Sequence, residues 1–75
     1  MMNLTIDIGN TNVMICFFNN NKLYSYENID VIKFKKSNVH QYIDKNCLDF
    51  KKLNVIISSV VPKIKKDFVE VFNKK

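Results

Sequence analysis

Apolar and polar residues alternate at the start of the chain. In residues 3–8, NLTIDI, every second residue is aliphatic, and the last polar residue between them is Asp7. This period of two predicts a strand with Asp7 on the side away from the aliphatic residues. Residues 13–18 are apolar throughout and predict a second strand that is covered on both faces. The four residues from Gly9 to Asn12 must then form a tight turn between antiparallel strands.

A second turn and a third strand follow. Asparagines occupy residues 19–21, and they can replace glycine in a turn because asparagine tolerates left-handed backbone angles. The third strand is predicted over residues 23–29. Its alternation places one set of side chains on one side (Tyr24, Tyr26 and Asn28) and the other set opposite (Leu23, Ser25, Glu27 and Ile29).

The spacing of apolar residues then becomes helical. Val39, Tyr42 and Ile43 share one helix face, which predicts a helix over residues 38–46. Either Ser37 or Asn38 is suited to its N-cap.

A strand and a second helix complete the chain. A strand is predicted over residues 53–58, because the short apolar stretch LNVIISS is typical of a buried parallel strand. Pro62 suits a first helical position. An amphipathic helix follows, with an apolar face of four residues: Ile64, Phe68, Val71 and Phe72.

The predicted order is therefore β-β-β-α-β-α, with three antiparallel strands and one parallel strand. This pattern predicts an α/β fold. With 75 residues, the chain is one domain at most. Since such a sheet needs more strands, we interpret residues 1–75 as a single partial domain of a larger α/β protein.

Composition excludes several classes. No apolar stretch approaches the roughly 20 residues that span a bilayer, and the N-terminus lacks the features of a signal peptide. We therefore expect a cytoplasmic protein without a membrane partner. Cys16 and Cys47 form no CxxC motif, so the sequence contains no cysteine metal or redox motif and gives no support for a disulfide between them. Cys16 is expected to be a small buried apolar residue.

The net charge of +5 is unevenly distributed. It is −2 over residues 1–32 and +7 over residues 33–75. A basic half can meet a polyanion, but every basic residue here is lysine, whereas specific base and phosphate recognition usually uses arginine. We expect a solvated lysine-rich surface and no specific nucleic-acid partner.

Asp7 has both a structural and a functional explanation. A carboxylate at the end of an inner strand is costly unless something pairs with it. In the structural explanation, it caps the turn by accepting hydrogen bonds from the amides of residues 9–11. In the functional one, Gly9, the only glycine, lets the backbone approach a bulky anion. If Gly9 has a positive φ, alanine there would destabilise the fold by more than about 1 kcal/mol.

The turn also offers donors to a phosphate. Successive N–H groups in a tight turn can bind an anion, Thr11 adds a hydroxyl, and Asn10 and Asn12 add side-chain amides. Asp7 would then hold Mg²⁺, directly or through water, because hard cations take carboxylate oxygens.

Two stretches resemble a known family. IDIGNTN, residues 6–12, and IISSVVP, residues 56–62, are similar to the two N-terminal signatures of type III pantothenate kinases. These enzymes belong to the actin-like, sugar-kinase and Hsp70-type ATPase superfamily, which has a ribonuclease H-like fold. The resemblance covers the whole chain, although residues 23–52 match in pattern only. It implies the N-terminal part of an enzyme that phosphorylates pantothenate with ATP in coenzyme A biosynthesis.

The resemblance also implies roles for residues. The ATP-binding turn of the family falls on Asp7, Ile8, Gly9, Asn10, Thr11, Asn12, Val13 and Met14, with Asp7 as the metal-associated acid. Residues 58–62 fall at the mouth of the cleft between two lobes. The valines there are expected in the core, and Ser58 and Ser59 are candidates to line the phosphate site. A K⁺ or NH₄⁺ ion and a homodimer of the full-length enzyme are implied as well.

This chain departs from the family in one essential segment. The family's catalytic base is the aspartate of a Gly-x-Asp-Arg segment, and this chain contains no arginine. No residue here is therefore assigned as catalytic, and we expect the isolated chain to be inactive. The monovalent-cation site of the family also has no counterpart in this sequence.

Two alternatives stay open. Ribonuclease H-like nucleases also begin with an acidic residue on a first strand, so the chain can be interpreted as a nuclease or nucleic-acid-binding module. That chemistry needs further carboxylates around metal ions, whereas Asp30, Asp44 and Asp49 are predicted in a loop, a helix and the exit of that helix. The other alternative is a non-enzymatic remnant or a regulatory relative of the kinases.

Overall fold

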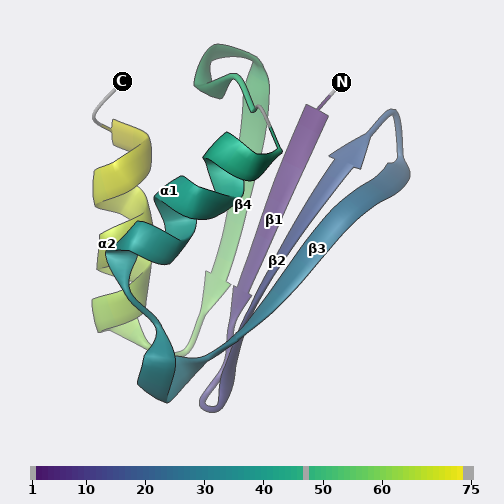
Figure 1. The fold of residues 1–75 in the computed structure, drawn as a ribbon. Coiled ribbons are helices and arrows are strands. Elements are labelled where there is room, and N and C mark those ends of the chain that lie inside the picture. The colour runs from purple at the N-terminus through teal and green to yellow at the C-terminus, as the bar shows by residue number, and fades with distance from the viewer. Residues whose placement is uncertain (1, 47, 74–75) are drawn as a thin grey trace.

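The computed structural model describes residues 2–46 and 48–73, and its elements follow the predicted order β-β-β-α-β-α (Figure 1). The strands are β1 (Met2–Ile8), β2 (Asn12–Asn19), β3 (Lys22–Asp30) and β4 (Leu53–Ser59). The α-helices are α1 (Lys36–Lys45) and α2 (Pro62–Asn73), and short 3-10 helices, η1 (Val31–Lys33) and η2 (Phe50–Lys52), precede α1 and β4.

The strands form one mixed sheet in the order β3-β2-β1-β4. β2 pairs antiparallel with both β1 and β3, whereas β4 pairs parallel with β1, as predicted. The turn between β2 and β3 consists of Asn20 and Asn21, whose φ angles are 53° and 69°. The prediction that asparagine replaces glycine in this hairpin is therefore confirmed.

A β-bulge near this turn corrects the predicted alternation in β3. Phe18 pairs with Leu23, but Phe17 pairs with Ser25, so Tyr24 is the additional residue. The ring of Tyr24 lies 6.3 Å from that of Phe17, which is a core residue. The predicted alternation is wrong for Leu23 and Tyr24, and it holds for the rest of the strand.

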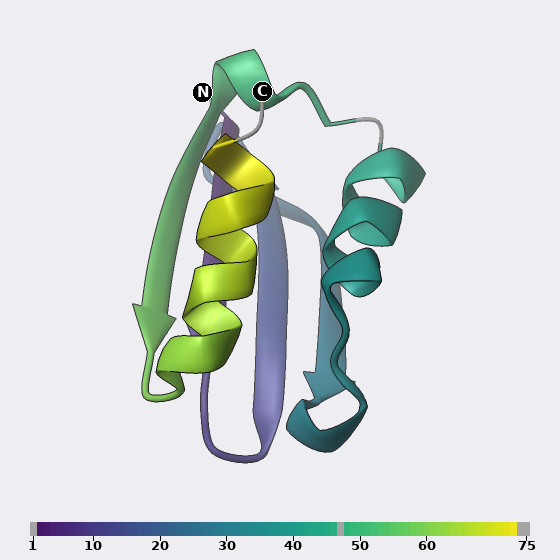
Figure 2. The ribbon, with the colours of Figure 1, turned by 90° about the vertical axis from the view of Figure 1, so that its left-hand side faces the viewer.

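Both helices cover the same face of the sheet (Figure 2). Fully burying an aliphatic or phenylalanine side chain in such a layer contributes about 1.5–3 kcal/mol. The core comprises Leu4, Ile6, Ile8, Val13, Ile15 and Phe17 of the sheet, Val39, Tyr42 and Ile43 of α1, and Ile64, Phe68, Val71 and Phe72 of α2. The apolar faces predicted for the two helices are thus confirmed.

The second face of the sheet, called the open face below, carries no helix in the part of the chain that is described (Figure 1). Met14, Cys16 and Phe18 alternate with the core residues of β2 and are half-buried. The expectation that β2 is covered on both faces is therefore wrong for this structure, and the Cys16 thiol is half-buried and free. Cys47, the other cysteine, lies outside the described residues.

The parallel strand β4 lies at an edge of the sheet. Its residues alternate between half-buried and exposed, and Ile56 is 59% exposed. The predicted burial of β4 is wrong for this structure because, among residues 2–46 and 48–73, the strand has a neighbour on one side only and a helix layer on one face only.

α1 begins two residues earlier than predicted. Its N-cap is Lys35, and neither Ser37 nor Asn38 takes that position. Asn38 instead stabilises the first turn from within, because its Oδ1 accepts a hydrogen bond of 2.7 Å from the backbone N–H of Lys35.

Contacts between the helical segments complete the helix layer. α2 begins at Pro62, as predicted. The rings of Phe34 and Phe68 lie 5.4 Å apart. At the surface, the Nζ of Lys36 donates a hydrogen bond of 2.7 Å to Glu70 Oε1, and this contact raises the pKa of Lys36.

This mixed sheet with two helices is an α/β fold, consistent with part of an actin-like, ribonuclease H-like domain. Within residues 2–46 and 48–73, no helix is long and apolar enough to cross a membrane.

Candidate phosphate and metal site

The β1–β2 hairpin, at the lower end of the sheet in Figure 1, holds most of the predicted site residues. Ile8 and Val13 pair at its base, and both side chains belong to the core. Next to this pair, within the loop, the Gly9 N–H donates a hydrogen bond of 2.9 Å to the carbonyl oxygen of Asn12. Ile8 and Val13 can therefore offer a ligand only their backbone, while residues 9–12 form the accessible part of the loop.

The tip of this hairpin presents free donors. The backbone N–H groups of Asn10 and Thr11 have no acceptor among the described residues. The Thr11 carbonyl oxygen accepts a hydrogen bond of 2.9 Å from the Val31 N–H, which fixes the tip against η1. The Thr11 Oγ1 accepts one of 3.2 Å from Asn12 Nδ2, so its own hydrogen stays available. Two successive free amides and a hydroxyl can bind an anion here.

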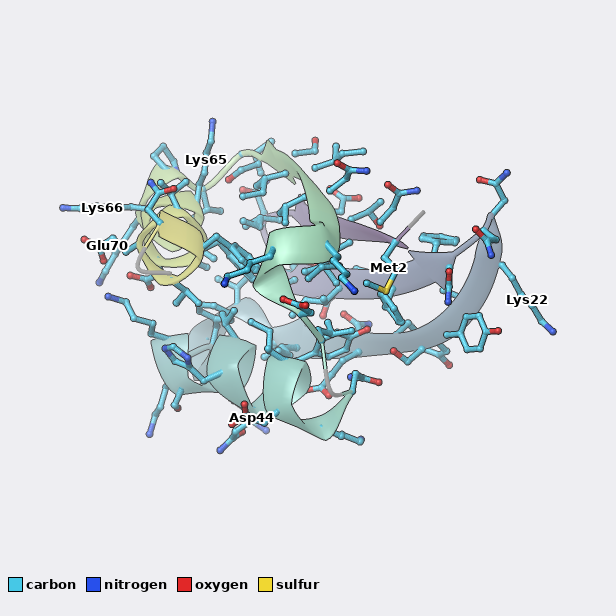
Figure 3. The ribbon with its side chains drawn as sticks, turned by 90° about the horizontal axis from the view of Figure 1, so that it is seen from above. Met2, Lys22, Asp44, Lys65, Lys66 and Glu70 are labelled. Atoms are coloured by element: carbon cyan, nitrogen blue, oxygen red, sulfur yellow. The ribbon has the colours of Figure 1, made fainter. Side chains whose placement is uncertain are left out.

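Asp7 lies beside this loop on the open face and is exposed. In the described chain, its carboxylate accepts no hydrogen bond and forms no ion pair. The lysines labelled in Figure 3 lie on other elements: Lys65 and Lys66 project outward from α2, and Lys22 lies at the β2–β3 turn. The structural explanation of Asp7 required hydrogen bonds from the amides of residues 9–11, so it is wrong. The carboxylate is available to a cation.

Gly9 is not required by the backbone of the hairpin. Its φ is not positive, so the condition for a steric penalty on alanine is not met. A Cβ placed at Gly9 would contact only the Asn12 carbonyl oxygen, at 3.6 Å, which is an ordinary distance. The missing side chain instead leaves open space next to the end of β1, where a bulky anion can approach the backbone.

A row of residues crosses the open face at the level of Asp7. Asp7 pairs with Ser58 of β4 and with Met14 of β2, and Met14 pairs in turn with Asn28 of β3. Asn28 is not among the residues predicted for the site. Without the bulge, the register set at the turn would pair Met14 with Glu27, so Asn28 joins this row because of the bulge.

The structure thus brings together most of the predicted site. Asp7, residues 9–12 and Ser58 lie at the same end of the open face, with Met14 half-buried beside Asp7. Ser59 pairs with Ile8 and therefore lies on the helix-covered face. Its hydroxyl bonds to the backbone of Val61.

The other acidic residues do not assemble around Asp7. Asp30 ends β3 opposite Asn12 rather than lying in a loop, Asp44 lies in α1, and Asp49 precedes η2. Within the described part of the chain, no three His, Cys, Asp or Glu side chains group closely enough to hold a metal ion. The carboxylate set of a two-metal nuclease is therefore not formed by these residues.

One free carboxylate beside phosphate donors does fit a magnesium–nucleotide. Mg²⁺ is usually held by one or two carboxylates together with substrate phosphates, and it keeps several of its waters. The described residues enclose no pocket, so this site is an open surface.

The fold is of the α/β class and is consistent with part of an actin-like, ribonuclease H-like domain, and the candidate site lies on its first hairpin. The family model of type III pantothenate kinase matches residues 3–75, and the chain belongs to that family. The type III pantothenate kinase of Dictyoglomus turgidum (strain DSM 6724 / Z-1310) is 37% identical over an alignment 75 positions long, and this alignment covers 92% of this chain and 29% of the relative. The chain thus spans less than a third of that relative's length.

Proposed function

We propose that residues 1–75 form the N-terminal, ATP-binding part of a type III pantothenate kinase, which transfers a phosphoryl group from ATP to pantothenate in coenzyme A biosynthesis. One observation carries the proposal. In a chain that belongs to this family, an Asp7 carboxylate without a partner among the described residues lies beside a hairpin with an open glycine and with amides that are likewise free there.

The hairpin residues have distinct roles in this proposal. Phosphoryl transfer depends mainly on positioning and charge neutralisation. The backbone amides of Asn10 and Thr11 and the Thr11 hydroxyl bind phosphate oxygens, and Gly9 leaves the room that the phosphates need. Asp7 holds Mg²⁺ directly or through water. When bound, that ion neutralises phosphate charge.

Some remaining parts of the proposal are supported by the family alone. The base that removes the proton from the pantothenate hydroxyl is supplied by a segment that this chain lacks. The complete enzyme uses K⁺ or NH₄⁺ and forms a homodimer. The expected cytoplasmic location and the absence of a specific nucleic-acid partner rest instead on the composition, which has no signal-peptide pattern and no arginine.

A chimaeric enzyme tests this function. Residues 3–75 of this chain replace the matching segment of the D. turgidum kinase, and pantothenate phosphorylation is measured with ATP, Mg²⁺ and K⁺. We expect the chimaera to be active and the isolated chain to be inactive, because only the chimaera contains a base. A folded chimaera without activity would contradict the proposal and favour a remnant. Product formed by the isolated chain would contradict its expected inactivity.

A further inference from the structure

Two adjacent serines of β4 have different environments. Ser58 pairs with Asp7 on the open face and is exposed, whereas Ser59 pairs with Ile8 and is half-buried. The sequence alone gives them equal standing as candidates for a phosphate site. Their hydrogen bonds distinguish them.

The hydroxyl of Ser59 is used by the fold. Its Oγ accepts a hydrogen bond of 3.0 Å from the Val61 N–H and donates one of 3.0 Å to the Val61 carbonyl oxygen. That carbonyl oxygen also accepts the N–H groups of Ile64 and Lys65, each at 3.1 Å, in the first turn of α2. Ser59 therefore shapes the connection from β4 into α2.

The hydroxyl of Ser58 is unused. It has no hydrogen-bond partner among the described residues, and it does not bond to the neighbouring Asp7. Just beyond Ser58, the Val60 N–H donates a hydrogen bond of 3.0 Å to the Ile8 carbonyl oxygen, which holds the end of β4 against β1. Since neighbouring strands lie about 4.8 Å apart, one ligand can contact Asp7 and Ser58 together.

We propose that Ser58 is a positioning residue of the Asp7 site, where its hydroxyl donates a hydrogen bond to a phosphate oxygen of a magnesium–nucleoside triphosphate. This inference rests on the proposed nucleotide-binding function. Asp7 binds the cation directly or through water, the hairpin amides bind phosphate from one side, and the Ser58 hydroxyl binds phosphate from the side of β4. Ser59 has no contact with the ligand.

The test uses the 75-residue chain labelled with ¹⁵N and titrated with Mg²⁺ and a non-hydrolysable ATP analogue up to millimolar concentrations. Amide shifts of residues 9–12 give Kd, and thermal melting gives stability. We expect Ser58→Ala to raise Kd about 3- to 10-fold, the range of one hydrogen bond, without lowering the melting temperature. Ser58→Thr retains a hydroxyl and should restore the affinity.

Two further variants make the test specific. Ser59→Ala should lower the melting temperature and leave the Kd of the folded chain unchanged. In an Asp7→Asn background, Ser58→Ala should raise Kd by a similar factor, because Asp7 binds the cation whereas Ser58 contacts a phosphate oxygen. Wild-type chain without saturable shifts in residues 9–12 would overturn the nucleotide site and this inference together. Binding that Asp7→Asn weakens but Ser58→Ala leaves unchanged would overturn the role of Ser58 alone.

Discussion

Gly9→Ala distinguishes a glycine that the backbone requires from one that a ligand requires. Because the φ of Gly9 is not positive and the new Cβ would lie 3.6 Å from its nearest neighbour, alanine fits without strain. Alanine also restricts the unfolded chain. Together these effects predict a free energy of unfolding that is unchanged or raised by up to about 1 kcal/mol. A glycine with a left-handed φ would give a loss of more than that amount.

The same methyl group should weaken nucleotide binding. It occupies the open space where the phosphate approaches the loop, so we expect Kd for the magnesium–nucleotide to rise at least about 10-fold, or 1.4 kcal/mol. Urea denaturation measures the stability, and titration of the loop amides measures the affinity.

Asn21→Ala in the other hairpin is the matched control for Gly9→Ala. Asn21 has a φ of 69°, so alanine there should cost about 1 kcal/mol or more of stability and leave nucleotide affinity unchanged. A Gly9→Ala chain that loses more than about 1 kcal/mol of stability would refute the structural reasoning. A Gly9→Ala chain with wild-type affinity would refute the role of the open space.

Three other predictions concern the core and the surface. Tyr42→Phe removes the 2.7 Å hydrogen bond to Ser25 Oγ and should lower the free energy of unfolding by about 1 kcal/mol. Burial raises the pKa of Tyr42 above its usual 10.0, so the fold favours the neutral phenol. The resulting contribution to stability is fully present below pH 10, and it is lost as the pH rises through the folded-state pKa. Between pH values below and above 10, the urea midpoint should fall less for Tyr42→Phe than for the wild-type chain. An equal fall in both would contradict the assignment of this pH dependence to Tyr42. Phe68 is fully buried, so Phe68→Ala should lower the free energy of unfolding by about 3–5 kcal/mol. That is a large share of the roughly 4–11 kcal/mol of total stability expected for a chain of this length. A cooperative melt at the wild-type temperature would exclude this packing. Duplex DNA should bind weakly, without sequence preference, and dissociate as salt rises, whereas submicromolar binding at physiological salt would revive the nucleic-acid alternative.

Local residue patterns predicted the elements of this fold, and long-range pairing limited the rest. Pro62 and the spacing of Phe68, Val71 and Phe72 are local signals, and they gave the start and the buried face of α2. The exposure of Ile56 depends on what covers the open face and the free edge of β4, and the stretch LNVIISS does not encode that covering. The covering of β2 depends in the same way on distant segments.

The candidate site was predictable in its residue types but not in its arrangement. The alternation of β1 placed Asp7 on the face away from the core, and the structure agrees. The bulge opposite Phe17 decides that Asn28, rather than Glu27, lies on the row of Asp7, and a one-residue shift of this kind has no local signal here. The different roles of Ser58 and Ser59 likewise depend on pairing with β1 and on the turn into α2.

Asp7→Asn in the chimaeric kinase tests the metal and phosphate site most directly. Because the Asp7 carboxylate makes no hydrogen bond within the described fold, the amide should leave the melting temperature unchanged. It removes the charge that a hard cation requires, so kcat should fall on the order of 10²–10³-fold. Asp44→Asn, the same change at an exposed position on α1, should leave both quantities unchanged. An Asp7→Asn chimaera with near-normal turnover would show that the carboxylate does not serve the metal and would contradict the proposed site.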